Sequence, residues 1–188
     1  MNRAQQYIAA GATLAALVAG VPSALGQAGS RSQFCTIAVR ASRLDGTLAG
    51  ENLAVTLSGG VSVQTASGDI ITSNTMAVAM GTNPVTKKTD ARTVSANGNV
   101  KLKTIQVIQP ASGAAYKRVI NASADKMVLN NFQHVVTLTG NVTVTADDPR
   151  ATSTWRNAAT ATLNLETKAI NADAANGQKM DLDIKPKG

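Results

Sequence analysis

Short runs of alternating apolar and polar residues dominate the chain after residue 34. The clearest runs span residues 52–57, 61–65, 76–80, 100–103, 135–139, 142–145 and 159–165. Successive side chains of a β-strand point to opposite faces, so this alternation predicts strands with one apolar face. Two longer Pro- and Gly-containing stretches, residues 81–93 and 109–115, are typical of exposed loops. No long segment after residue 34 has helical spacing, and the pattern predicts an all-β fold.

The strands belong to an internal repeat. Residues 55–63 (VTLSGGVSV), 94–102 (VSANGNVKL) and 136–144 (VTLTGNVTV) share a strand-Gly-strand pattern. Their central glycines at positions 59, 98 and 140 are 39 and 42 residues apart, a period typical of stacked repeats. A further strand follows each copy, at residues 70–80, 119–130 and 156–166, and a fourth unit is expected over residues 170–184.

Each repeat places apolar residues at matching positions around its glycine, and Thr, Ser or Asn between them. The glycine permits a positive φ or a bulge that redirects the strand, and an ordinary hairpin turn is the alternative. The apolar positions are expected to share one face of the sheet: Val55, Leu57, Val61, Val63, Val100, Leu102, Val136, Leu138, Val142 and Val144.

The N-terminal segment has the three parts of a secretory signal. Arg3 supplies a positive charge, residues 8–20 are almost entirely apolar, and residues 24–26 fit a small-x-small cleavage site. We expect a signal peptide at 1–26, which would form a helix, a lead-in strand or linker at 27–44, and one β domain at 45–184. A retained anchor in the inner membrane is the alternative, but the apolar run is short for the roughly 20 residues of a spanning helix.

Charge and cysteine content narrow the possible partners. The formal net charge of +7 favours anionic partners. The positive charges are spread along the chain and aromatic residues make up only 3% of it, so a nucleic-acid interface is not expected. The single cysteine, Cys35, excludes an internal disulfide, and it does not follow the small-residue box of a lipoprotein.

The residues that carry enzyme chemistry are sparse. The only histidine, His134, precedes an alternating strand and has no nucleophile–carboxylate constellation near it in sequence. One Cys and one His give no zinc-ligand spacing, and the acidic pairs 147–148 and 181/183 lack the ligand density of a calcium loop. We therefore expect no catalytic residue, no metal and no cofactor. Trp155 is expected to be a packing or rim residue.

Two stretches resemble a known family. Residues 122–130 (ASADKMVLN) and 134–145 (HVVTLTGNVTVT) are similar to the repeat of the OstA-like proteins, the LptA-type periplasmic lipopolysaccharide transporters and their LptC-like relatives. The resemblance covers about residues 45–175. The earlier copy departs from the pattern, with Thr75 in the place of Asp125 and Gly60 in the place of Asn141.

The resemblance implies an open, twisted antiparallel β-jelly-roll, or β-taco, whose two faces form a V with an apolar interior. It implies a non-catalytic periplasmic protein that relays lipopolysaccharide or a related glycolipid toward the outer membrane, with acyl chains in a groove lined by the ten apolar residues. Each buried CH₂ of such a chain contributes about 0.8 kcal/mol. Edge-strand addition to a second copy or to other bridge proteins is also implied. Lys87, Lys88, Lys101 and Lys103 are the candidates to attract headgroups at the groove mouth, and solubilising surface charge is the alternative for them.

Two other interpretations remain open at this point. A structural or adhesive secreted β-repeat protein would use the same strands but fill its interior with its own side chains. A small periplasmic enzyme on a β scaffold would need converging titratable groups, which the sequence does not reveal.

Overall fold

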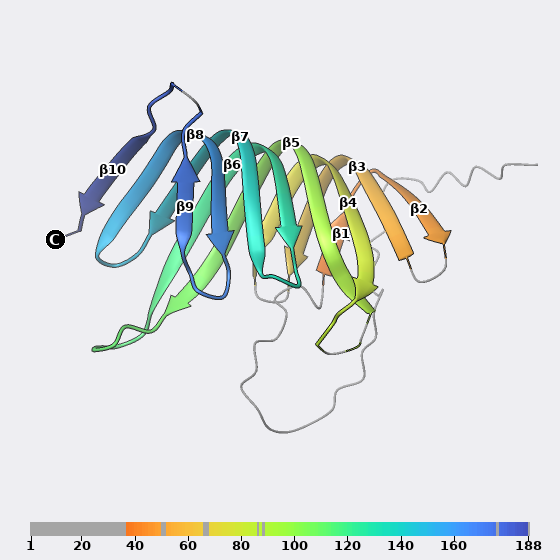
Figure 1. The fold of residues 1–188 in the computed structure, drawn as a ribbon, viewed down its shortest axis with the longest axis horizontal. Helices are drawn as coiled ribbons and strands as arrows, with labels where there is room; N and C mark the ends of the chain where they lie inside the picture. The colour runs from red at the N-terminus through yellow and green to blue at the C-terminus, as the bar shows by residue number, and fades with distance from the viewer. Residues whose placement is uncertain are drawn as a thin grey trace, which may run out of the picture.

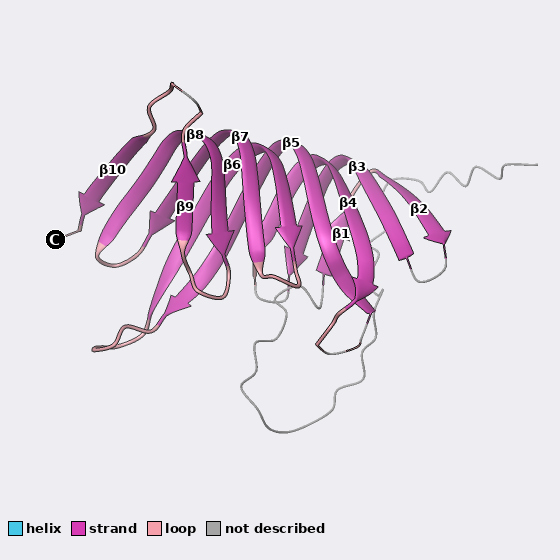
Figure 2. Cartoon of the chain, in the orientation of Figure 1, coloured by secondary structure: helices cyan, strands magenta, loops and turns pink. Residues whose placement is uncertain are grey.

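A computed structural model describes residues 37–49, 52–65, 68–85, 87, 89–175 and 177–187. Within these ranges the chain consists of strands, turns and loops, as Figure 2 shows. The expected signal peptide, most of the lead-in segment and Cys35 lie outside the described residues. The strands are β1 (Ile37–Arg40), β2 (Arg43–Ala49), β3 (Asn52–Thr65), β4 (Ile70–Thr82), β5 (Thr89–Ile108), β6 (Tyr116–Asn130), β7 (Val135–Asp147), β8 (Ala151–Asn164), β9 (Ile170–Asp173) and β10 (Asp181–Pro186).

All ten strands form one antiparallel sheet with the order β1-β3-β4-β5-β6-β7-β8-β10. At one end, β1 and β2 share the outer edge of β3, with β1 on residues 62–65 and β2 on residues 52–58. At the other end, β9 pairs with residues 160–163 of β8 and β10 with residues 151–156. The two ends do not pair with each other, so the sheet stays open.

The long strands bend near their middles, and Figure 1 shows the bends aligned along the upper edge of the molecule. The pairing register shifts at these bends in every pair from β3–β4 to β7–β8. The bends divide the sheet into two facing half-sheets. The β9 half comprises residues 43–49, 52–58, 75–82, 89–97, 126–130, 135–139, 160–164 and 170–173. The β10 half comprises residues 37–40, 61–65, 70–73, 100–108, 116–124, 142–147, 151–156 and 181–186.

The glycines of the repeat lie at the bends of β3, β5 and β7. Gly140 and Asn141 both have positive φ, 78° and 48°, a conformation that a β-branched residue adopts only at a cost. A Cβ on Gly140 would lie 2.5 Å from Oδ2 of Asp125 on the neighbouring strand. Asn141 Nδ2 donates to that same oxygen at 2.9 Å. The bulge is thus held by the next strand as well as by its own backbone.

The expected strand-Gly-strand repeat is confirmed, and the hairpin alternative is wrong. β3, β5 and β7 each continue through their glycines as one strand. The expected loop at 81–93 is shorter than the sequence indicated, because β4 extends to Thr82 and β5 starts at Thr89. The fourth unit is reduced to the short strands β9 and β10.

The inner faces of both halves pack into one hydrophobic cluster. Large side chains from the two halves, such as Leu138 and Ile120, are completely buried in it. Full burial of a Val, Leu or Met side chain contributes about 1.5–3 kcal/mol. Burial of apolar side chains between the two half-sheets is therefore the main contribution that holds them against each other.

Candidate functional site

The structure gathers the ten predicted groove residues into the interior between the half-sheets. Nine of them are at most 3% exposed, and the tenth, Val55, is half-buried and packs against the same cluster. The parity read from the sequence is therefore correct on both sides of each glycine. In this closed form the ten side chains contact one another, and their contact with lipid stays a prediction.

A pocket of about 230 Å³ remains open between the ends of β6, β7 and β8 and the start of β9. Its walls come from both half-sheets. Ile170 starts β9, and Lys168 lies in the turn before it. The other lining residues belong to the β10 half or to the turn after β7. We call it the end pocket, and it is lined by Arg118, Ala146, Asp148, Ser153, Trp155, Lys168 and Ile170. It combines apolar surface with two cationic side chains and the carboxylate of Asp148.

Strand β10 extends the apolar surface beside this pocket. Leu182 pairs with Trp155 and Ile184 pairs with Ser153, and side chains of paired residues lie on the same face of a sheet. Leu182 and Ile184 are 52% and 57% exposed. Large apolar side chains thus reach solvent on the inner face at this end of the molecule.

Asp148 holds the cationic side of the end pocket in place. The Arg118 guanidinium forms an ion pair with its carboxylate at 3.2 Å, and the backbone N–H groups of Arg150 and Ala151 donate to it at 2.9 and 3.1 Å. Burial raises the pKa of Asp148, but these hydrogen bonds and the charge of Arg118 outweigh burial, so the pKa is lowered overall. Asp148 is therefore ionised at neutral pH and orients Arg118.

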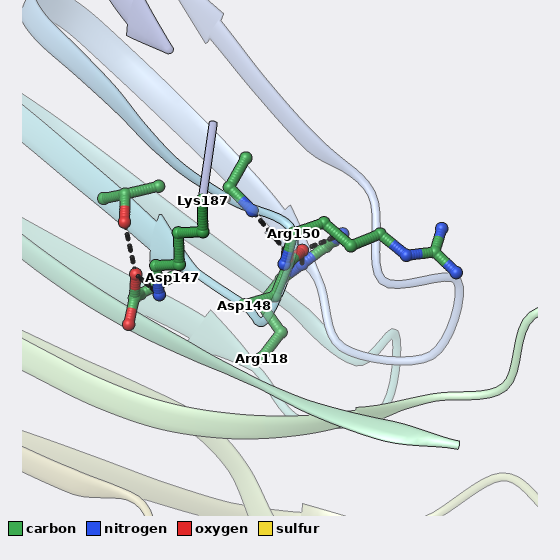
Figure 3. A network of polar contacts seen from close by, with 7 residues as sticks. Arg118, Asp147, Asp148, Arg150 and Lys187 are labelled. Atoms are coloured by element: carbon green, nitrogen blue, oxygen red, sulfur yellow. Dashed lines mark hydrogen bonds and ion pairs between the residues drawn. The ribbon is translucent and has the colours of Figure 1, made fainter. Parts of the chain in front are cut away.

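Asp147 has a separate set of partners, as Figure 3 shows. The Lys187 ammonium lies 2.7 Å from its carboxylate, and Thr152 donates to the same carboxylate. The hydrogen bond from Lys187 is the main reason that the pKa of Asp147 is lowered. This ion pair fastens the end of β10 to β7 across the intervening strand β8.

The lysines expected at the groove mouth lie elsewhere. Lys101 and Lys103 line a shallow hollow of about 450 Å³ with Thr143 and Thr145, on the outer face of the β10 half. Lys87 lies in the β4–β5 loop, and Lys88 is outside the described residues. The expectation was wrong for Lys101 and Lys103 because they alternate with the buried Val100 and Leu102 and must face outward.

The described residues show no arrangement typical of a catalytic or metal centre. His134 lies in the β6–β7 turn, where its carbonyl oxygen accepts a hydrogen bond from the N–H of Leu165. No group of three or more His, Cys, Asp or Glu residues in the described ranges is placed to hold a metal ion. This part of the chain also contains no helix of the length and hydropathy needed to span a bilayer.

Sequence reasoning missed most of the end pocket. It anticipated Trp155 as a packing or rim residue, and Trp155 does line the pocket and pack against the core. No sequence pattern marked Arg118 or Lys168 as a site residue, because they lie 50 residues apart in ordinary strand and turn contexts. Only the pairing of β6, β7 and β8 and the position of β9 bring them together.

These features define an open antiparallel β-jelly-roll with an apolar interior. No protein-family model and no curated protein matches the sequence. Among solved structures, the fold is similar to LptH from Pseudomonas aeruginosa, described as the LptA-homologous periplasmic component of the lipopolysaccharide transport device. The two chains are 19% identical, with a TM-score of 0.60, and the match covers 83% of this chain and 100% of LptH. At this identity the similarity establishes the fold.

Proposed function

We propose that the chain is a non-catalytic periplasmic carrier that holds the acyl part of lipopolysaccharide or a related glycolipid between its half-sheets. The observation that carries the proposal is the end pocket, where accessible apolar side chains adjoin Arg118 and Lys168. An acyl chain gains free energy from the apolar wall, and phosphate or carboxylate groups on the headgroup are attracted to the cations. The similarity of the fold to LptH supports this proposed function.

The carrier must open to receive a long chain, since the interior is filled by its own side chains. The end pocket and the exposed Leu182 and Ile184 provide the entrance. Separating the half-sheets from that end exposes Val142 and Val144, and then the deeper groove residues. Acyl chains would replace the contacts that the half-sheets make with each other.

The open ends of the sheet support a second part of the proposal. In the described chain, β9 and β10 have a strand neighbour on one side only, and so do β1 and β2. Unpaired strand edges accept added strands. End-to-end contact with a second copy or with another bridge protein would join the apolar interiors of neighbouring molecules into a continuous path.

One observation favours the structural β-repeat function instead. Nine of the ten predicted groove residues are at most 3% exposed, which is the closed core expected of that class. The two functions differ in whether lipid reaches the interior, so the test must probe both the entrance and the core.

Photo-crosslinking to lipopolysaccharide separates the two functions. A photoreactive amino acid replaces Leu182 at the entrance or Leu138 in the core, and Asp183 or Thr139 serves as the adjacent control on the opposite face. The carrier predicts labelling at 182 and 138 several-fold above 183 and 139. Labelling at 182 alone would restrict binding to the entrance, and equal labelling at all four positions would favour the structural function.

A further inference from the structure

The inner face of β5 buries two polar side chains near the rim of the β10 half. Thr104 is 2% exposed and Gln106 is 1% exposed. Neither the Thr104 hydroxyl nor either polar atom of the Gln106 amide has a hydrogen-bond partner among the described residues. A buried amide without a partner is costly, because it loses its hydrogen bonds to water and gains none in return.

Other buried polar side chains of the interior do have partners. Ser73 donates to the carbonyl oxygen of Thr75 at 2.9 Å. Asn131 donates to the carbonyl oxygen of Ala91 at 2.8 Å. Thr104 and Gln106 therefore differ from their buried polar counterparts, and the difference calls for a partner from outside the chain.

The local sequence makes this burial more unusual. Residues 104–108 read TIQVI, so a strand that followed its hydrophobic pattern would turn Ile105 and Val107 inward. The structure does the opposite, and Val107 is 59% exposed on the outer face. Departures from local patterning of this kind are expected at functional sites, where a binding group takes precedence over stability.

Gln106 lies directly beside the end pocket. It pairs with Arg118 on β6, and paired residues of neighbouring strands point to the same side of the sheet. Arg118 lines the end pocket, and neighbouring strands are about 4.8 Å apart. A molecule seated in the pocket therefore reaches Gln106 by extending one strand further along the inner face.

We infer that Gln106, assisted by Thr104, is a polar subsite for the amide group of an amide-linked acyl chain. The inference rests on the proposed lipid-carrying function and names the linkage that the interior selects. A secondary amide has one N–H donor and one carbonyl acceptor, and the Gln106 side chain supplies the complementary acceptor and donor. An ether-linked chain supplies no donor and leaves the Gln106 carbonyl unpaired.

The test compares two amphiphiles with the same chain length and a pyranose headgroup. N-dodecanoylglucosamine carries the amide at C2, and 2-O-dodecylglucose carries an ether oxygen at the same carbon. Binding below the micellar concentration is followed by the fluorescence of Trp155, the single tryptophan of the chain. The variants are Gln106→Met, which keeps the side-chain length, and Thr104→Val, which replaces only the hydroxyl by a methyl group. Gln109→Met, at an exposed position three residues after Gln106, is the control.

We expect the wild-type protein to bind the amide-linked amphiphile about tenfold more tightly than the ether, since one paired buried amide contributes on that order. Gln106→Met should abolish the preference, raise the melting temperature of the ligand-free protein by about 3 °C and leave ether binding within about twofold. Thr104→Val should show the same trends more weakly, and Gln109→Met should change nothing.

The outcomes separate the two proposals. If the wild-type protein binds both amphiphiles equally, or if Gln106→Met weakens both to the same extent, the amide subsite is wrong while the carrier function stands. If the wild-type protein binds neither amphiphile and crosslinks no lipopolysaccharide, both proposals fall.

Discussion

The two half-sheets are built from the same six long strands, yet their inner faces differ. The β9 half presents apolar side chains almost to its rim, with Leu129, Val136 and Leu163 all buried there. The β10 half also buries apolar side chains such as Ile120, but toward its rim the inner face carries Thr104, Gln106 and the ion pair of Arg118 with Asp148. The two half-sheets therefore share the same strands but differ in the polarity of their inner faces.

This difference suggests that one half-sheet mainly provides stability and the other provides polar groups for a ligand. Core packing against the β9 half holds the molecule together, because burial of apolar surface requires no specific partner. The polar rim of the β10 half contributes less to stability and leaves polar groups available to a ligand. Three substitutions test this division, and their expected effects on the free energy of unfolding decrease in order.

The largest effect is expected from a polar substitution in the β9 half. Leu163→Gln places an amide without a partner at a position that is 0% exposed and should cost about 3–5 kcal/mol. Urea denaturation measures the loss, with Thr162→Gln on the outer face as a control expected within about 0.5 kcal/mol. If both variants are equally stable, the β9 half tolerates buried polar groups as the β10 half does.

A change at the bend should weaken both halves together. Gly140→Ala imposes a positive φ on alanine and brings its Cβ within 2.5 Å of Asp125 Oδ2, for an expected loss of about 2–3 kcal/mol. Gly60→Ala is the matched control, because Gly60 also has a φ of +78° but nothing lies within 4 Å of its added Cβ, and about 1 kcal/mol is expected. Equal losses in thermal or urea unfolding would show that the contact with Asp125 does not matter.

The smallest effect is expected in the polar rim. Asp148→Asn removes the charge that pairs with Arg118 and should cost on the order of 1 kcal/mol at neutral pH. The pKa of Asp148 is lowered in the folded protein, so its contribution is complete above the unfolded pKa of about 3.9 and is lost as the pH falls through the folded value.

The variant should therefore lose less stability than the wild type when the pH is lowered below about 4. Asp45→Asn, in an exposed ion pair with Arg43, is the control and should stay within about 0.5 kcal/mol of the wild type. An unchanged acid dependence in Asp148→Asn would contradict the assigned role of the Arg118 ion pair.

The sequence by itself determined the all-β class, the repeat and the buried face, because strand alternation and bend glycines are local properties. Val61, Leu138 and Val142 were placed correctly because the bends of β3, β5 and β7, each with two positive-φ residues, keep the same inward parity on both sides. The repeated glycines predicted a positive φ, a bulge or a hairpin turn, and the contact of Asn141 with Asp125 belongs to the bulge.

Only the tertiary structure decided the chemistry of the interior. Arg118, Asp148 and Lys168 meet because three strands and the turn before β9 bring them together, and no spacing in the sequence encodes that meeting. The burial of Gln106 runs against its local pattern, since the hydrophobic alternation of residues 104–108 alone would turn Ile105 and Val107 inward. Periodicity specifies which residues share a face, whereas register across strands specifies which residues share a site.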